Sequence, residues 1–189
     1  MKILRKGRSF CLKIFSFIRM KIYINYLNFF FDNIMLAPSV SIGKFADITS
    51  TDKGSIQIHG NVSVGDFSKI IAKSGNVIIE KNVFIGNGCI LVSRKDISIG
   101  EGTLIGEYVV IRDQDHISNQ SSIKDSGFYS DPIIIGKNCW LGAKVSVLRG
   151  SVIGDGAVIG AHSLVRGYIP PYTLAVGCPA KVIKHLPRP

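Results

Sequence analysis

The chain carries an aliphatic residue at every sixth position over most of its length. From residue 135 onward the series is Ile135, Leu141, Val147, Ile153, Ile159 and Val165, and glycine directly follows four of these six residues. A period of six fits neither an amphipathic helix, with roughly 3.6 residues per turn, nor a long alternating strand. It indicates short strands broken by turns, each with one aliphatic side chain pointing inward and with glycine where the backbone turns tightly.

The same period reaches back toward residue 40. A second series runs through Ile79, Ile85, Leu91 and Ile97, slips by two residues, and resumes at Ile99, Ile105 and Ile111; weaker members precede it at Ile42, Ile48, Ile58, Val64 and Ile70. Three such units make one triangular coil, and stacked coils bury the aliphatic residues as a continuous core. The sequence therefore predicts an all-β fold, a parallel β-helix of about six coils over residues 40–165.

Smaller side chains lie four residues after the aliphatic residues of the last series, namely Cys139, Val145, Ser151, Ala157 and Ser163. They would fill corners that are too narrow for large side chains, and we interpret Cys89 and Cys139 in this way. The four cysteines, which also include Cys11 and Cys178, show neither C-x-x-C spacing nor close pairing. This spacing predicts neither a zinc site nor a disulfide framework, and it favours a reducing, cytoplasmic compartment.

The aliphatic series is interrupted once. Residues 112–132 read RDQDHISNQSSIKDSGFYSDP, are mostly polar, and are followed by a restart of the period. A solenoid accommodates such an insertion as a loop that projects from one corner, and loops of this kind commonly build a functional site. This loop contains His116, and histidine is the side chain best suited to accept a proton near pH 7.

The formal net charge of +10 is concentrated at the two ends of the chain. Residues 1–31 hold seven basic residues and no acid, and residues 181–189 hold three basic residues and no acid. The remainder holds 13 basic and 13 acidic residues and is neutral. A nucleic-acid surface needs a basic face on the body of the protein, so the sequence predicts no nucleic-acid partner.

Residues 1–35 are predicted to form a basic amphipathic helical segment. One apolar face consists of Phe10, Ile14, Phe17 and Ile18, at helical spacing. Lys13 and Arg19 divide the segment into runs too short for a signal peptide, and its longest uncharged run is far below the roughly 20 residues of a membrane span. Two roles stay open: the helix caps the open end of the first coil, or it contacts an anionic membrane from the inner side.

Three motifs then occur in order toward the C-terminus: W-x-G at 140–142, I-P-P at 169–171 and G-x-P-A-K at 177–181. With them the chain resembles the hexapeptide-repeat acyltransferases over roughly residues 40–185, and most of all the sugar and polysaccharide O-acetyltransferases. The resemblance implies that the β-helix, at 36–170, is left-handed, and that a basic tail occupies 171–189. It also implies a homotrimer with active sites between neighbouring subunits.

The activity that the resemblance implies is acetyl transfer from acetyl-CoA to a hydroxyl of a sugar or of a surface-glycan precursor, without a metal. His116 lies where the family carries its catalytic histidine, and it would act as general base. Asp113 and Asp115 flank it, and either carboxylate, or a backbone carbonyl, could orient its ring. Acetyl transfer to the amine of an amino sugar stays open, because the same base serves an amine.

Several residues match positions at which the family binds coenzyme A. Trp140 would pack near the reactive end of the pantetheine arm, and Ala143 and Ala161 match positions that present backbone groups along the arm. Lys181 and Lys184 match basic residues directed at the nucleotide phosphates.

The chain departs from the family at residues 166–168, where many relatives have Thr-Lys-Asp. The Arg-Gly-Tyr found here moves the cation by one position, to Arg166, which is the candidate for this phosphate contact.

Two residues are candidates for binding the acceptor. Asn87 lies across the expected subunit interface from the loop, and its structural alternative is a corner position with positive φ. Arg94 falls near a position where relatives acting on simple glycosides carry an acid, so an anionic sugar would be consistent with it.

Two other classes of protein remain as alternatives. A metal-dependent carbonic anhydrase would need three converging histidines, which the spacing of His59, His116, His162 and His185 does not offer. A non-catalytic β-helix binding protein would need neither the loop nor its histidine.

Overall fold

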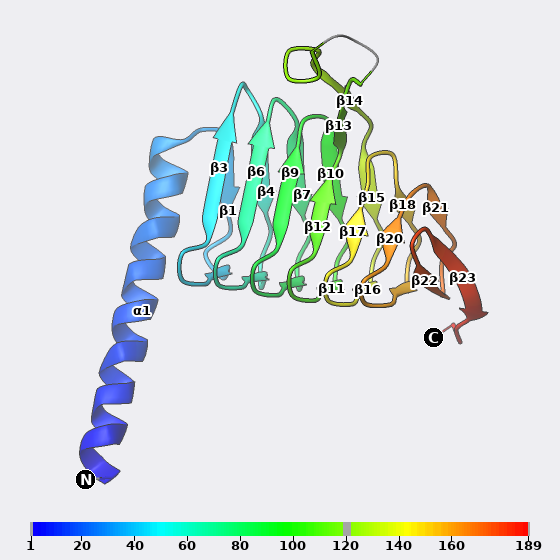
Figure 1. Ribbon diagram of the computed structural model, residues 1–189. Coiled ribbons are helices and arrows are strands. Elements are labelled where there is room, and N and C mark those ends of the chain that lie inside the picture. Colours follow the sequence, from blue (N-terminus) through cyan, green and yellow to red (C-terminus); the bar gives the residue numbers. More distant parts are fainter. Residues whose placement is uncertain (1, 119–121, 189) are drawn as a thin grey trace.

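The computed structural model describes residues 2–118 and 122–188, with side chains described from residue 14 onward. One helix, α1 (Lys2–Phe30), precedes a stack of short strands that forms a left-handed parallel β-helix of about six turns (Figure 1). The fold class predicted from the six-residue period is confirmed.

The strands form three flat faces, each a parallel sheet that runs the length of the stack. Face A consists of β1 (Ile34–Leu36), β4 (Ser55–Ile58), β7 (Asn76–Ile79), β10 (Asp96–Ile99), β15 (Ile133–Ile135), β18 (Val152–Ile153) and β21 (Tyr168–Ile169). Face B consists of β2 (Ser41–Ile42), β5 (Ser63–Val64), β8 (Phe84–Ile85), β11 (Leu104–Ile105), β16 (Trp140–Leu141), β19 (Val158–Ile159) and β22 (Thr173–Gly177). Face C consists of β3 (Asp47–Thr51), β6 (Lys69–Lys73), β9 (Ile90–Ser93), β12 (Val110–Arg112), β17 (Ser146–Val147) and β20 (Leu164–Val165).

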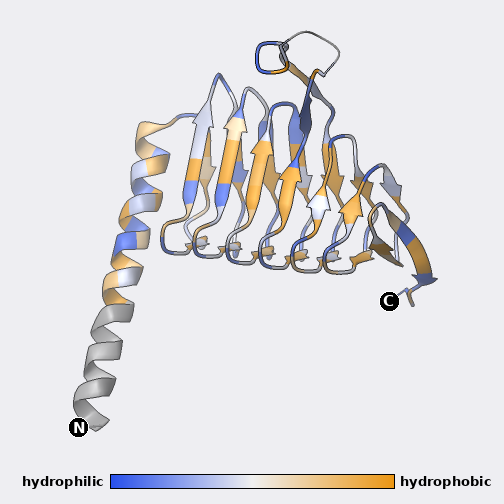
Figure 2. Cartoon of the chain, viewed as in Figure 1, coloured by the Kyte–Doolittle hydropathy of each residue, from blue (hydrophilic) through white to orange (hydrophobic). Residues whose placement is uncertain are grey.

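The predicted aliphatic ladders line the interior of the stack. On face A the inward residues Leu36, Ile58, Ile79, Ile99, Ile135, Ile153 and Ile169 lie in register, and none is more than 4% exposed. Each such side chain contributes about 1.5–3 kcal/mol by leaving water, so the ladders are the main source of stability. Figure 2 shows the hydrophobic strands and the largely hydrophilic loop above them.

The slip by two residues in the sequence has a structural cause. In β7 both Val77 and Ile79 point inward, whereas β18 contributes Ile153 alone. Register partners are therefore 20 residues apart at Val77 and Ile97, and 18 apart at Ile135 and Ile153. On this face, each strand of the coils before the loop thus carries one more inward-pointing residue than β18 does.

Helix α1 caps the open end of the first coil. Ile24 and Leu27, only 2% and 3% exposed, belong to the same buried cluster as the strand ladders. The Asn28 amide accepts a hydrogen bond from Leu36 N–H at 2.8 Å and donates one to Leu36 C=O at 2.9 Å. Asn28 thus pairs with the edge strand β1 as a further strand would, and the capping role is confirmed.

The helix face that packs on the coil is not the predicted one. Ile14, Phe17 and Ile18 are 43–57% exposed, and the side chain of Phe10 lies outside the described residues. The prediction of this face was wrong because α1 is apolar on two sides, and helical spacing alone does not show which side meets the core. Within the described residues, no helix is long and apolar enough to cross a membrane.

The C-terminal segment extends the solenoid. Strand β22 pairs in parallel with β19, and β23 (Ala180–His185) folds back antiparallel against β22. The G-x-P-A-K motif forms the turn between these two strands, so residues 171–189 contain β22, the last strand of face B, and β23 paired with it, rather than only a basic tail.

Candidate active site

The interrupting loop leaves the stack at the corner between faces C and A, which we call the loop corner (Figure 1). It contains a small antiparallel ribbon of β13 (Gln114–His116) and β14 (Phe128–Ser130), in which His116 lies opposite Phe128. The same corner of other coils holds Arg94, Arg149 and Arg166, which join a strand of face C to the next strand of face A.

Asp113 anchors the start of the loop to the preceding coil. Its carboxylate is fully buried and accepts hydrogen bonds from Ser93 Oγ (2.8 Å), Arg94 N–H (2.7 Å) and Lys95 N–H (2.8 Å). A buried carboxylate needs such donors, because an unpaired buried charge is strongly unfavourable. The loop corner therefore fixes the residue three positions before His116.

Arg149 ties together the two strands of the loop. Its Nε donates to Asp115 Oδ2 at 2.7 Å, and its Nη1 donates to Asp131 Oδ2. The hydrogen bonds to Asp115 and Asp131 raise the pKa of the Arg149 guanidinium, so it stays cationic. Asp115 lies on β13, and Asp131 directly follows β14. The Arg149 cation therefore holds the two strands of the loop together.

His116 is exposed and packs against Phe128, with 4.3 Å between ring centroids and 44° between the ring planes. Arg94 Cζ lies 3.8 Å from the centroid of the same Phe128 ring. The structure thus brings Arg94 and His116 together around one aromatic side chain, on a support fixed by Asp113. Among the described residues, no hydrogen bond joins His116 to Asp113 or Asp115, both of which have other partners.

The sequence did not reveal Phe128 or Arg149 as site residues. Phe128 meets His116 only through the pairing of β13 with β14, and the polar loop sequence has no alternating pattern that predicts this ribbon. Arg149 reaches Asp115 across 34 positions of sequence. A cation at the loop corner of the coil after the loop is the one signal that could have indicated it.

The corner between faces B and C, which we call the glycine corner, repeats the pattern of a glycine, a variable residue and a residue with positive φ. The variable residues stack in the order Lys44, Asp66, Asn87, Glu107, Ala143 and Ala161. In the early coils, the side chain of a variable residue accepts a hydrogen bond from the backbone N–H of the variable residue in the preceding coil. Asn87 Oδ1, for example, accepts from Asp66 N–H at 2.8 Å. The positive φ expected at Asn87 belongs instead to Gly88, at 68°.

Alanine changes this corner in the last coils. Because Ala161 has no side-chain acceptor, it cannot cap the Ala143 N–H as Asn87 caps that of Asp66. Among the described residues, the Ala143 N–H donates to no protein group. A glycine at 142 brings the two backbones together, since a Cβ there would lie 2.6 Å from Ala161 N. The glycine corner thus offers a free backbone donor beside a narrow surface.

Trp140 lies on face B directly before this corner and is 55% exposed. It is in register with Leu104, which is in turn in register with Phe84, and these are 50% and 46% exposed. The exposed Trp140 ring beside a free amide donor fits a pantetheine arm, which has apolar methylenes and amide groups. The residues predicted to hold coenzyme A, Trp140, Ala143 and Ala161, therefore lie together and fit that group.

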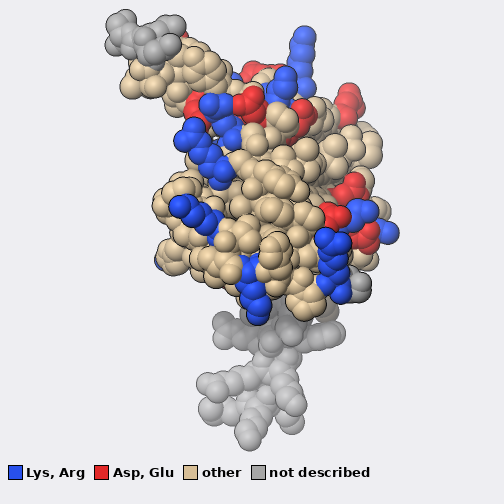
Figure 3. Space-filling model, turned by 90° about the vertical axis from the view of Figure 1, so that its right-hand side faces the viewer, with Lys and Arg blue, Asp and Glu red and all other residues tan. Residues whose placement is uncertain are grey.

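The predicted phosphate-binding cations are more dispersed. Lys181 and Lys184 are exposed on β23, and Arg166 is exposed at the loop corner. Figure 3 shows the C-terminal end of the stack, where basic side chains form several separate groups and acidic side chains lie beside some of them. The end of the solenoid is not a continuous basic patch.

The two groups of candidate residues lie at different corners of one chain. His116 and Arg94 are at the loop corner, and Trp140, Ala143 and Ala161 are at or beside the glycine corner, with the strands of face C between the corners. One chain alone therefore does not bring the candidate base to the candidate coenzyme surface.

Cys89 and Cys139 are structural residues, as predicted. Both are buried, and their thiols donate to Gly106 C=O at 3.1 Å and Gly154 C=O at 3.2 Å. Burial raises the pKa of each thiol to about 11. They fill corners in the protonated form. Among residues 2–118 and 122–188, no group of three His, Cys, Asp or Glu side chains is arranged to hold a metal ion.

Comparison with known proteins agrees with this fold. The family described as bacterial transferase hexapeptide (six repeats) matches residues 132–167. Rv3034c of Mycobacterium tuberculosis, described as an acetyltransferase, is 38% identical over 156 residues, which are 81% of this chain and 52% of that protein. WbbJ of Escherichia coli K12, described as a lipopolysaccharide biosynthesis O-acetyl transferase, is 37% identical over 141 residues, covering 69% of this chain and 72% of WbbJ.

A solved structure gives the same result. The polySia-specific acetyltransferase NeuO superposes with a TM-score of 0.66 at 29% identity, over 77% of this chain and 66% of the NeuO chain. The fold and the matched repeats define a class of protein, the hexapeptide-repeat acyltransferases. The chain belongs to this family, and its relatives there include O-acetyltransferases such as WbbJ. It spans about half the length of Rv3034c.

Proposed function

We propose that the protein is an acetyl-CoA-dependent O-acetyltransferase that modifies a hydroxyl of a sugar or of a surface-polysaccharide precursor. The observation that carries the proposal is the exposed His116, held on an anchored loop beside Arg94 and Phe128. Similarity to WbbJ, described as an O-acetyl transferase of lipopolysaccharide biosynthesis, and to NeuO, described as a polySia-specific acetyltransferase, supports a glycan acceptor.

In this proposal His116 is the general base. When bound, acetyl-CoA supplies an acyl thioester. A ring nitrogen of His116 takes the hydroxyl proton of the acceptor as its oxygen forms a bond to the acyl carbon. The carbon–sulfur bond breaks, and His116 returns the proton to the departing sulfur. Phe128 supports the ring, and Asp113 and Arg149 hold the loop, so that little motion of the base is needed during the reaction.

The acceptor is proposed to lie beside Arg94. The Arg94 side chain is partly exposed, and the planar face of its guanidinium is occupied by Phe128. Its edge is then the part available to an acceptor, which favours a sugar that carries an anionic group near the modified hydroxyl. Asn87 is a weaker acceptor candidate, because its side-chain oxygen already caps Asp66 N–H.

We propose that a second copy completes the site. His116 and the coenzyme surface of Trp140 and Ala143 lie at different corners, so the glycine corner of one subunit would face the loop corner of its neighbour. Rotational symmetry repeats this contact in every subunit, and a homotrimer of triangular solenoids closes it. Lys181, Lys184 and Arg166 are the cations available for the coenzyme phosphates. A cytoplasmic location is proposed, because acetyl-CoA and reduced thiols both belong to that compartment.

The test is acetyl transfer by a His116→Ala variant. Candidate glycans are incubated with enzyme and acetyl-CoA, and mass spectrometry seeks the gain of one acetyl group. Loss of the base should lower kcat by about 10²–10⁴-fold with the trimer intact. His59→Ala is the matched control, because His59 is exposed on an early coil and pairs with Glu80 at 2.8 Å. Unchanged transfer by His116→Ala would refute the assignment, and failure of the wild type to bind acetyl-CoA would favour a non-catalytic protein.

A further inference from the structure

The side of α1 that faces away from the coils is apolar. Its exposed residues are Ile14 (43%), Phe15 (70%), Ile18 (49%), Ile22 (64%) and Phe29 (80%). Ile18, Ile22 and Phe29 are separated by whole helical turns, and Ile14 and Phe15 flank the same line, so the five lie on one side, opposite the side on which Ile24 and Leu27 pack. We call these five residues the outer face. Single exposed apolar residues need no explanation, but a continuous line of them on one helix does.

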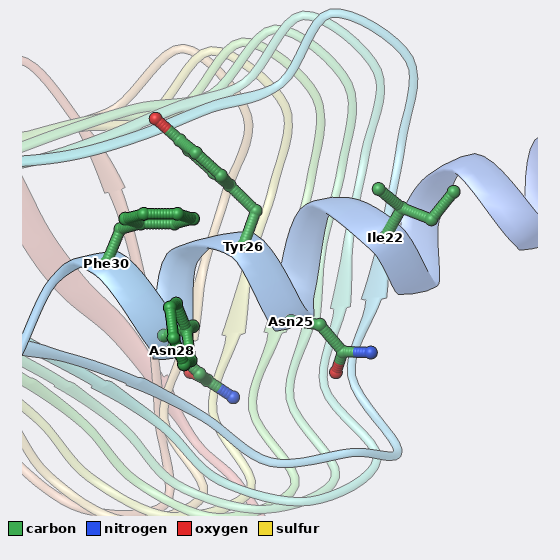
Figure 4. Close-up of a pocket in the computed structure, with 6 residues that line it drawn as sticks. Ile22, Asn25, Tyr26, Asn28 and Phe30 are labelled. Carbon is green, nitrogen blue, oxygen red and sulfur yellow. The ribbon is translucent and has the colours of Figure 1, made fainter.

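Aromatic side chains broaden this surface near the end of the helix. Tyr26 and Phe30 have ring centroids 5.0 Å apart, and Phe29 meets Phe30 edge to face, also at 5.0 Å. Together with Ile22, Asn25 and Asn28 they line a shallow hollow on the helix surface. Figure 4 views this hollow with the coils behind the helix, and Tyr26 and Phe30 project from the same side. Of these rings Tyr26 carries a hydroxyl, and an aromatic ring with a polar tip is typical of a boundary between water and an apolar phase.

The charge of this segment indicates which partner the outer face would bind. Residues 1–31 hold seven basic residues and no acid. Arg19, which directly follows Ile18 of the outer face, is exposed. Repulsion between two segments of seven positive charges opposes the pairing of two copies through this face. An anionic surface instead gains from each Lys or Arg near it.

We propose that the outer face of α1 docks on the surface of an anionic lipid bilayer, with the helix lying in the plane of the interface. The apolar residues would enter the boundary between headgroups and acyl chains, to a depth of about 5–10 Å. The inner face already packs on the first coil through Ile24 and Leu27, so the helix is folded and oriented before it binds. This inference does not depend on the proposed catalytic function.

The position of the helix suits such docking. It lies across the open end of the stack, so its outer face points away from the coils, and the loop with His116 projects from a corner farther along the stack (Figure 1). Docking would therefore leave the candidate site uncovered. If the proposed trimer has parallel solenoids, all three outer faces lie at the same end and bind one membrane together.

The experiment is flotation of the full chain with lipid vesicles. Vesicles of phosphatidylcholine alone are compared with vesicles in which about one third of the lipid is anionic phosphatidylglycerol. The wild type should float with the anionic vesicles, and added salt should weaken its binding because salt screens the charges. The Ile18→Asn/Ile22→Asn double variant should bind the anionic vesicles at least about tenfold more weakly than the wild type.

Ile183→Asn is the matched control. Ile183 is 62% exposed, close to the 64% of Ile22, but lies on β23 at the opposite end of the stack. It should bind vesicles as the wild type does. Thermal unfolding checks that the double variant is folded, as expected for exposed positions. Wild-type protein that does not float with anionic vesicles, or a double variant that floats as well as the wild type, would overturn the proposal. The proposal would also be overturned if the wild type self-associated without lipid and the double variant lost this self-association but still floated with the vesicles.

Discussion

The backbone N–H of Arg94 donates a 2.7 Å hydrogen bond to the buried carboxylate of Asp113, at the start of the loop that carries His116. The side chain of the same arginine packs on Phe128, from the opposite strand of the loop ribbon. Arg94 therefore contacts both strands, one through its backbone and the other through its guanidinium. The loop that carries His116 is held by the coil beneath it rather than only by its own two strands.

Removing the buried carboxylate should loosen this support. In Asp113→Ala, Ser93 Oγ and the backbone N–H groups of Arg94 and Lys95 lose their acceptor in a buried place. We expect the free energy of unfolding to fall by about 2–4 kcal/mol, measured by urea denaturation, and acetyl transfer to fall with it. Asp125→Ala is the control, because Asp125 is an exposed loop carboxylate that pairs with Ser122 at 2.7 Å. Equal stability of the two variants would contradict the anchoring role.

The bridge made by Arg149 should matter for catalysis more than for stability. Arg149→Met removes the contacts with Asp115 and Asp131, and the loop strands lose the cation that joins them. Exposed ion pairs contribute little to stability, so the midpoint of urea unfolding should stay near that of the wild type. We expect kcat to fall about tenfold or more, with the KM for acetyl-CoA unchanged, because the coenzyme surface lies at the other corner.

Arg149→Lys separates charge from geometry in the same assay. A lysine keeps the positive charge but does not present two parallel donors in a fixed fork. It should recover only part of the lost kcat. Full activity in Arg149→Met would show that the bridge does not position His116.

The fold could be predicted from the sequence because each ladder residue has a local cause. Ile135 and Ile153 point inward for the same reason, a strand of two or three residues between two turns, and the period records this directly. His116 and Trp140 could be named because the family motifs fix their places. Phe128 and Arg149 could not, because their roles come from contacts across the loop and between coils. The side of α1 that packs on the first coil could not be predicted either, because both sides of the helix are apolar.

Trp140 should contribute to binding the coenzyme. Trp140→Ala removes the largest exposed apolar surface beside the free Ala143 N–H, so the KM for acetyl-CoA should rise roughly 5–50-fold, while kcat at saturation changes less. Phe84→Ala is the control, because Phe84 lies in the same column of face B, two strands earlier, and is 46% exposed. Steady-state kinetics with varied acetyl-CoA distinguishes the two. An unchanged KM in Trp140→Ala, or an equal rise in both variants, would refute the assigned coenzyme surface.

The cysteines should differ widely in reactivity, because burial holds the pKa of Cys89 and Cys139 at about 11. At pH 8 only about one in a thousand of each buried thiol is ionised, and the thiolate is the form that reacts. Exposed Cys178 should therefore be alkylated first by iodoacetamide in the native protein, and Cys89 and Cys139 only after unfolding, as peptide mass spectrometry can show.

The same raised pKa values predict a loss of stability in alkali. The ordinary pKa of a thiol is 9.0, so between about pH 9 and 11 the unfolded chain releases the protons of Cys89 and Cys139 while the folded chain keeps them. The contribution of these groups is complete below pH 9, and the free energy of unfolding should decline as the pH rises through this window. A Cys89→Ala/Cys139→Ala variant should show a shallower decline in urea titrations at each pH. An identical slope in the variant, or native alkylation of Cys139 as fast as that of Cys178, would contradict the protonated, buried state of these thiols.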